Sequence, residues 1–206
     1  MKTGCPLILA SASPRRELLL KQAGYEFEVI PSQVDESHIE VSGLDCRQAA
    51  ERLALAKARD VAALHPHRPV LAADTVVDAD GQLIGKPADA ADAEAILRRL
   101  FGKPHKVVTA VAFIWKSRQT EEVESQITWV YPKMLTEEQI ADYIAGGSWH
   151  GKAGAYGIQE TNDAFVDRID GSFTNVVGLP MERVDSILKR AGIYPLAGRK
   201  PAPESA

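Results

Sequence analysis

The chain has 206 residues, with 24 basic and 28 acidic side chains and a formal net charge of −4. This balance leaves no excess of positive charge to neutralise a nucleic-acid backbone, so it argues against a general DNA or RNA binder. A small anionic ligand held by local cations stays compatible with it. The composition, 45% apolar and 25% charged, is that of a globular protein that is long enough to bury its own core.

No membrane or secretion signal stands out in the sequence. The longest apolar run, residues 107–115, is about half of the roughly 20 residues that a membrane span needs. The apolar run near the N-terminus is too short for a signal peptide. Cys5 and Cys46 match no metal-binding spacing and make a poor disulfide framework. We therefore expect a reduced, cytoplasmic protein.

Apolar periodicity and turn residues divide the chain into interleaved strands and helices. Pro14 directly after Ser13 is typical of a helix start, and Gly24 is typical of a helix end. In chain order, the expected strands are residues 7–10, 25–30, 70–77, 83–84, 105–115, 121–131 and 164–169, and the expected helices are residues 14–23, 45–64, 89–101, 136–145 and 179–191.

The connections between these elements predict the fold class. Residues 78–81 supply a hairpin turn, and the long strands 105–115 and 121–131 are expected to pair antiparallel. Other strands are joined through helices, so we expect an α/β fold with a mixed sheet flanked by helices. A single domain over residues 1–194 is expected, with two lobes and a central cleft. Residues 195–206 lack periodicity and are expected to be a disordered tail.

Residues 11–16, Ser-Ala-Ser-Pro-Arg-Arg, lie where a strand passes into a helix. Backbone N–H groups and the positive helix end favour an anion there, and the planar fork of arginine can hold two phosphate oxygens. This pattern predicts a phosphate cradle made by Ser11, Ser13, Arg15 and Arg16. An ordinary helix cap followed by solvated arginines is the alternative.

Acidic residues at two positions suggest further chemistry. Asp74 interrupts the apolar strand 70–77, where its carboxylate would lose hydration and need a cation or hydrogen bonds. Lys86, beyond the hairpin, could return to the same end of the sheet, although Asp74 could also simply cap a strand. Glu36 follows Asp35 in a loop, and adjacent carboxylates suit Mg²⁺ or Mn²⁺, although solvated loop acids are commoner.

The glycine-rich segment 151–159 is a candidate ligand loop. Glycines at this density let a backbone approach a ligand closely. Gln159 offers both a donor and an acceptor that could read a base edge. A tight surface loop is the alternative.

Taken together, six segments resemble the Maf family of nucleotide pyrophosphatases in family order: residues 11–16, 34–36, 73–75, 85–87, 152–159 and 175–180. The resemblance runs from about residue 7 to residue 192. It implies a single α/β domain around a long, strongly bent sheet, like that of the inosine triphosphate pyrophosphatases. It also implies a divalent-metal-dependent hydrolysis of a nucleoside triphosphate between its α and β phosphates, and a homodimer.

The resemblance carries roles onto individual residues. With it, our hypothesis is that Asp74 is the catalytic base and that Asp74 and Glu36 hold Mg²⁺ or Mn²⁺. The implied phosphate-binding residues are Ser11, Ser13, Arg16, Lys57 and Lys86. One departure stands directly before Lys57, where this chain has Ala56 and many family members have Glu. A role of that Glu in metal binding or in orienting Lys57 therefore does not carry over.

Three positions resemble the branch of the family that acts on dTTP and UTP: Arg15, Thr75 and Gln159. The branch acting on 7-methyl-GTP would carry an aromatic residue, Gln and Glu there. The expected function is hydrolysis of dTTP and UTP, or of modified pyrimidine nucleotides, to the monophosphate and pyrophosphate. The alternatives are a 7-methyl-GTP pyrophosphatase, a phosphatase acting on monophosphates, and a non-catalytic nucleotide-binding regulator, because the family has been linked with septum formation.

Overall fold

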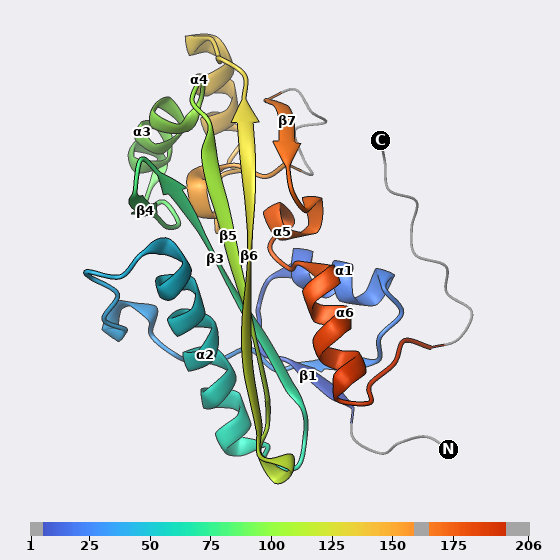
Figure 1. Ribbon diagram of the computed structural model, residues 1–206. Helices are drawn as coiled ribbons and strands as arrows, with labels where there is room; N and C mark the ends of the chain where they lie inside the picture. Colours follow the sequence, from blue (N-terminus) through green and yellow to red (C-terminus); the bar gives the residue numbers. More distant parts are fainter. Residues whose placement is uncertain (1–5, 159–164, 197–206) are drawn as a thin grey trace.

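The computed structural model describes residues 6–158 and 165–196. Within these residues, seven strands form one mixed sheet in the order β2-β1-β3-β5-β6-β7, with β4 paired to β3 (Figure 1). The strands are β1 (Leu7–Leu9), β2 (Phe27–Val29), β3 (Val70–Ala79), β4 (Gln82–Ile84), β5 (His105–Trp115), β6 (Thr120–Pro132) and β7 (Val166–Asp170). The helices are α1 (Pro14–Gln22), α2 (Cys46–Leu64), α3 (Ala90–Leu100), α4 (Glu137–Ala145), α5 (Phe173–Val177) and α6 (Met181–Arg190), with short 3₁₀ turns η1 (Glu36–His38), η2 (Lys116–Arg118) and η3 (Ala153–Ala155).

The sheet confirms the expected α/β class with mixed strand directions. β1 pairs parallel with both β2 and β3, whereas β3, β5, β6 and β7 pair antiparallel in succession. The predicted hairpin joins β3 to β4 through Asp80 and Gly81, whose φ angles are 54° and 77°. Positive φ at both central residues is the two-residue turn that matches the twist of paired strands.

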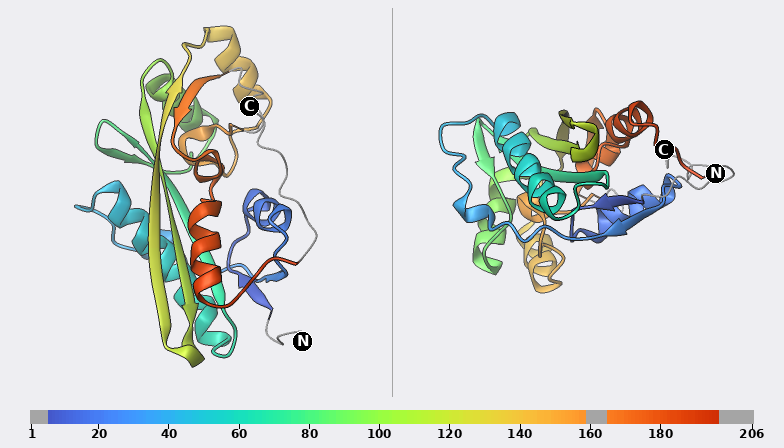
Figure 2. Two further views of the ribbon diagram at one scale, coloured as in Figure 1. Left: turned by 45° about the vertical axis from the view of Figure 1, so that its right-hand side comes forward. Right: turned by 90° about the horizontal axis from the view of Figure 1, so that it is seen from below.

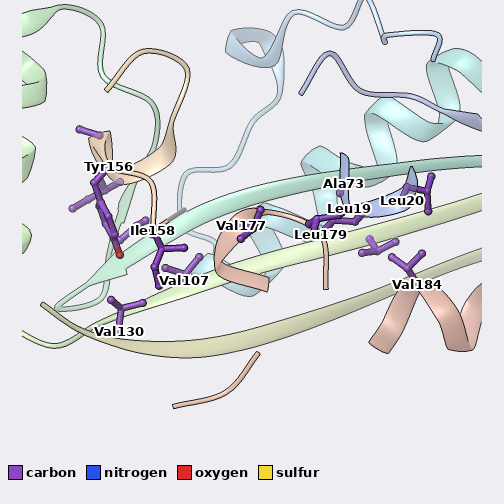
Figure 3. Close-up of a cluster of buried hydrophobic side chains, with 14 of the residues drawn as sticks. Leu19, Leu20, Ala73, Val107, Val130, Tyr156, Ile158, Val177, Leu179 and Val184 are labelled. Atoms are coloured by element: carbon purple, nitrogen blue, oxygen red, sulfur yellow. The ribbon is translucent and has the colours of Figure 1, made fainter. Parts of the chain in front are cut away.

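Helices cover both faces of the long strands. The small side chains of α2 pack on one face, against Ile8, Ala72 and Val76. The opposite face of β3, with Leu71 and Val77, packs against α1, α3, α6 and η3. Viewed from below, the strands lie between α2 and α6 (Figure 2). Figure 3 shows buried side chains on this opposite face, which follow the long strands from α1 to the segment after η3.

One edge of β3 is open in its middle. β1 pairs only with Val70 and Leu71, and β4 pairs only with residues 77–79. Among the described residues, no strand covers this edge of β3 over residues 72–76. Asp74 and Thr75 lie in this gap, and because side chains alternate along a strand they face opposite sides of the sheet.

The C-terminal part departs from the expected pattern. The expected helix 179–191 is observed as α6, and a further short helix, α5, precedes it. Ser172 caps α5, and Gly178 ends it with a φ of 118°. Five residues give no apolar periodicity that a sequence pattern could detect, which is why α5 was not predicted.

The remaining boundaries shift by a few residues. β2 is shorter than the expected strand 25–30, and as an edge strand it leaves Val29 37% exposed. Part of the expected strand 164–169 and most of the expected tail 195–206 lie outside the described residues. Leu196, the last described residue, donates its N–H to the carbonyl of Gly24. In the parts of the chain that the structure describes, no helix is both long and apolar enough to span a membrane.

Candidate functional site

A cleft of about 410 Å³ lies along the open edge of β3. β1, β2, α1 and α6 surround the lower half of the long strands in Figure 1, and α3, α4 and β7 surround the upper half. Both halves line the cleft: Ser11 and Arg15 come from the lower lobe, and Lys86 and Gly151 from the upper one. The expected arrangement of two lobes around a central cleft is therefore observed.

The start of α1 forms one wall of the cleft. Ser13 caps the helix and accepts the N–H of Arg16, with Pro14 in the first turn. Ser11 accepts the N–H of Ser13 at 3.2 Å. Arg15 reaches across the cleft, where its Nη2 lies 3.5 Å from the carbonyl oxygen of Gly151. This wall therefore presents a helix N-terminus and a partly exposed guanidinium to the same space.

Two carboxylates share one ammonium group on the opposite wall. Asp74 is only 5% exposed, and its Oδ1 accepts a hydrogen bond from Lys57 Nζ at 2.5 Å. The same Nζ lies 2.9 Å from Glu36 Oε1. Asp74 faces the side of the sheet that α2 covers, so Lys57 of α2 can reach it. The cation that a buried carboxylate needs is thus Lys57 rather than Lys86.

Glu36 also contacts a second cationic side chain, that of Lys86. Lys86 Nζ lies 3.4 Å from Glu36 Oε1, on the solvent side of Lys57. Burial alone would raise the pKa of Glu36, but the hydrogen bonds and charges of Lys57 and Lys86 outweigh it, and the pKa is lowered. Glu36 is therefore a carboxylate at neutral pH.

Arg16 is bound almost entirely by protein oxygens. Its Nε donates to the Gly178 carbonyl at 2.7 Å and its Nη1 to the Ala73 carbonyl at 2.8 Å. Nη1 also contacts Ser11 Oγ at 3.3 Å, and Nη2 donates to Thr75 Oγ1 at 3.1 Å. The side chain thus joins α1, β3 and the turn between α5 and α6.

The structure brings nearly all the predicted site residues into this cleft: Ser11, Ser13, Arg15, Arg16, Glu36, Lys57, Asp74, Thr75 and Lys86. Gln159 lies outside the described residues. The roles given to these residues stay predictions.

Three polar groups behind the cleft were not singled out from the sequence. Thr109 and Asn175 are fully buried and hydrogen bonded to each other, and the carbonyl of Gly178 accepts from Arg16. Asn175 and Gly178 belong to the segment 175–180 that contributed to the resemblance. A buried threonine in a strand such as Thr109 carries no signal of its own.

The donor set fits a hard divalent cation. In the described part of the chain, no cluster of three or more His, Cys, Asp and Glu side chains could enclose a metal. Glu36 and Asp74 nevertheless lie close together, because both contact Lys57. Mg²⁺ is usually bound by one or two carboxylates and completes its shell with water and substrate phosphates. Two carboxylates in a cation-lined cleft meet that requirement.

The model of the family described as "Maf-like protein" matches residues 6–191. This chain belongs to the Maf family. Among its relatives is the "dTTP/UTP pyrophosphatase" of Syntrophomonas wolfei, 47% identical over 89% of this chain and 96% of that protein. The protein of the same name from Koribacter versatilis is 47% identical over 92% of this chain and 96% of the relative.

Among solved structures, this Maf protein aligns in part with the Staphylococcus aureus Ham1 protein. The TM-score is 0.42 at 15% sequence identity, covering 62% of this chain and 71% of that one.

Proposed function

We propose that this Maf protein is a pyrophosphatase that hydrolyses dTTP and UTP between the α and β phosphates, giving the monophosphate and pyrophosphate. The observation that carries the proposal is the cleft itself. One nearly buried carboxylate, Asp74, faces it beside cations from separate elements, Arg15, Lys57 and Lys86. Cations spread over both lobes suit three linked phosphates better than one. The names of the relatives from S. wolfei and K. versatilis support the choice of substrate.

In the proposed mechanism, Asp74 accepts the proton of the attacking water. Its carboxylate lies at an open strand edge, within reach of a molecule in the cleft. Lys57 donates to Asp74 and also lines the cleft, where its ammonium group would neutralise a phosphate oxygen. Arg15 and Lys86 neutralise charge that develops on the leaving pyrophosphate. Most of the rate enhancement comes from these fixed charges.

The proposal includes Mg²⁺ or Mn²⁺, held by Glu36 and Asp74. When bound, the cation would neutralise phosphate oxygens and make a coordinated water easier to deprotonate. Both carboxylates contact Lys57, so the ammonium group and a divalent cation would compete for the same oxygens.

The proposed preference for pyrimidines rests on Arg15, Thr75 and Gln159. The neutral amide of Gln159 can both donate to and accept from a uracil or thymine edge. A methylated, cationic guanine would favour an aromatic face and a carboxylate instead. A cytoplasmic location and a homodimer, both expected from the sequence, are parts of the same proposal.

A nucleotide panel tests the proposed function. Purified protein, stripped of metal and then supplied with Mg²⁺ or Mn²⁺, is assayed on dTTP, UTP, 7-methyl-GTP and dTMP. We expect pyrophosphate and monophosphate from dTTP and UTP, and no turnover without added metal. Orthophosphate from dTMP would identify a phosphatase instead, and faster turnover of 7-methyl-GTP would overturn the pyrimidine assignment. Nucleotide binding without any product would indicate a regulator.

A further inference from the structure

We propose that Arg16 is a positioning residue that holds the strand edge carrying Asp74, and that it is not a ligand of the substrate phosphates. This inference rests on the proposed function in one respect, because it takes Asp74 as the catalytic carboxylate. The contacts that carry it are all within the protein.

The first argument is the hydrogen-bond ladder along β3. The N–H of Ile8 donates to the Pro69 carbonyl at 2.9 Å, and the N–H of Ala10 donates to the Leu71 carbonyl at 2.8 Å. The chain then turns away toward α1, so the next carbonyl on the same edge, that of Ala73, has no strand partner on this side. Arg16 Nη1 donates to it at 2.8 Å. The guanidinium therefore continues the ladder where β1 ends.

The second argument is that Arg16 holds both neighbours of Asp74. Nη1 binds the Ala73 carbonyl and Nη2 binds Thr75 Oγ1. Nε meanwhile binds the Gly178 carbonyl. The backbone before the carboxylate and the side chain after it are thus tied to one planar group, which is itself fixed to the turn before α6.

The third argument is the number of donors that remain. A guanidinium has five N–H donors, and Arg16 uses four of them on Gly178, Ala73, Ser11 and Thr75. A guanidinium that binds phosphate in a bidentate manner uses two parallel N–H groups. Arg16 has only one N–H left. Arg15 differs, since among the described residues its guanidinium makes a single hydrogen bond, at 3.5 Å.

The fourth argument concerns the direction of the hydrogen bonds at Thr75. Thr109 Oγ1 donates to the Asn175 carbonyl at 2.9 Å, and a carbonyl can only accept. The Thr109 hydroxyl hydrogen is therefore committed, so in the 3.0 Å contact between the two threonines Thr75 is the donor. Arg16, Thr75 and Thr109 form a chain of donors that ends on α5. The hydroxyl hydrogen of Thr75 is thus committed to this chain, and Thr75 contacts a substrate only through its remaining lone pair or its methyl group.

A matched pair of variants, Arg16→Lys and Arg15→Lys, tests the inference. Lysine keeps the charge in both and removes the planar fork. For Arg16→Lys we expect kcat on dTTP to fall about 10²-fold, because misplacing a reacting group by about 1 Å costs that much, with KM within about twofold of wild type. For Arg15→Lys we expect mainly a rise in KM, of about tenfold.

Binding of inorganic tripolyphosphate, measured by calorimetry without metal, supplies a readout independent of turnover. We expect the affinity of Arg16→Lys to stay within about twofold of wild type, and that of Arg15→Lys to fall about tenfold. Loss of tripolyphosphate affinity in Arg16→Lys, or a wild-type kcat, would overturn the inference. If the wild-type protein releases no pyrophosphate, the proposed function fails, and the tripolyphosphate comparison still decides whether Arg16 holds phosphate.

Thr109→Val gives a second test that does not touch the cleft. Thr109 is 0% exposed, and valine keeps its shape while removing the acceptor of the Thr75 hydroxyl. We expect kcat to fall about tenfold with an unchanged tripolyphosphate affinity. A role in folding alone would lower the melting temperature and leave kcat as it is, and that result would count against the inference.

Discussion

A carboxylate at position 74 is costly to bury in the middle of an apolar strand. Apart from Thr75 and Asp78 the strand is otherwise apolar, and Asp74 keeps only 5% of its surface exposed. Desolvation of an ionised group costs several kcal/mol unless a partner replaces the water. Lys57 supplies that partner, and Glu36 shares it. The arrangement gives Asp74 a cationic partner while its side chain still lines the cleft.

Replacing Asp74 by Asn should remove the proposed base while preserving its shape. We expect turnover of dTTP to fall by at least about 10²-fold to 10³-fold, as for other losses of a group that acts in the transition state. Asp78→Asn is the matched control. Asp78 lies on the same face of β3, outside the cleft, and pairs with Lys106 at 3.2 Å. Steady-state kinetics with circular dichroism checks both, and full activity of Asp74→Asn would contradict the assignment.

A buried histidine supplies a pH-dependent contribution to stability. His105 is 1% exposed, and its Nδ1 lies 3.3 Å from the Lys103 carbonyl, which can only accept. Nδ1 therefore carries the hydrogen, and Nε2 accepts from the hydroxyl of Tyr156 at 2.7 Å. Burial lowers the pKa of His105.

The folded protein thus holds His105 neutral at a pH where the unfolded chain takes up a proton, below about 6.5. The contribution of His105 to the free energy of unfolding is fully present above that pH, and it decreases as the pH falls toward the lowered pKa. His105→Gln cannot take up that proton, so we expect its melting temperature to change less between pH 7.5 and pH 5.5 than that of wild type. Equal slopes for His105→Gln and wild type would refute the argument.

At the scale of elements, η3 closes the upper wall of the cleft. Gly154 inside this turn has a φ of 73°, in the left-handed region that glycine favours. Its backbone also lies against β3 and α3. An added Cβ would be 2.9 Å from Val77 Cγ2 and 3.2 Å from Leu100 Cδ1. Both conformation and space therefore require glycine here.

Gly154→Ala should destabilise the protein more than Gly151→Ala does. Gly151 has a similar φ of 67°, but an added Cβ there meets nothing within 4 Å. Gly151→Ala carries only the conformational penalty, about 1 kcal/mol. Overpacking adds about 1–3 kcal/mol at position 154. Urea unfolding of the two variants measures the difference, and equal losses would show that η3 does not pack as described.

At the scale of the whole molecule, three long strands connect the two lobes, and the cleft lies where both lobes meet the open edge of β3 (Figures 1 and 2). Arg15 and Gly151 are 136 residues apart in sequence and face each other across it. A triphosphate bound there would contact both lobes at once. The ligand should therefore stabilise the whole fold rather than one part of it.

A pyrimidine triphosphate analogue that resists hydrolysis, supplied with Mg²⁺ at one hundred times its Kd, should raise the free energy of unfolding by about 2.7 kcal/mol. Thymidine without phosphates should have a much smaller effect at the same concentration, because the proposed contacts are mostly to phosphate. Denaturant unfolding followed by fluorescence and by circular dichroism gives the measurement. Stabilisation by thymidine equal to that by the analogue would contradict a phosphate-directed cleft.

Local patterns account for the parts of this protein that could be predicted from sequence. Ser13 before Pro14 and Gly24 after the helix are signals from neighbours within a few residues, and α1 begins and ends beside them. The hairpin turn and the antiparallel pairing of β5 with β6 follow from short connections in the same way. The amino-acid sequence by itself determined these elements, the α/β class and membership of the Maf family.

Only the tertiary structure decided which groups meet. Lys57, rather than Lys86, pairs with Asp74, because α2 covers the face of β3 toward which that carboxylate points. Arg16 donates to the main-chain carbonyls of Ala73 and Gly178. Because every residue has such a carbonyl, no sequence pattern predicts which of them Arg16 contacts. Contacts of this kind depend on where strands end and helices cross, which is set by the packing of the whole chain.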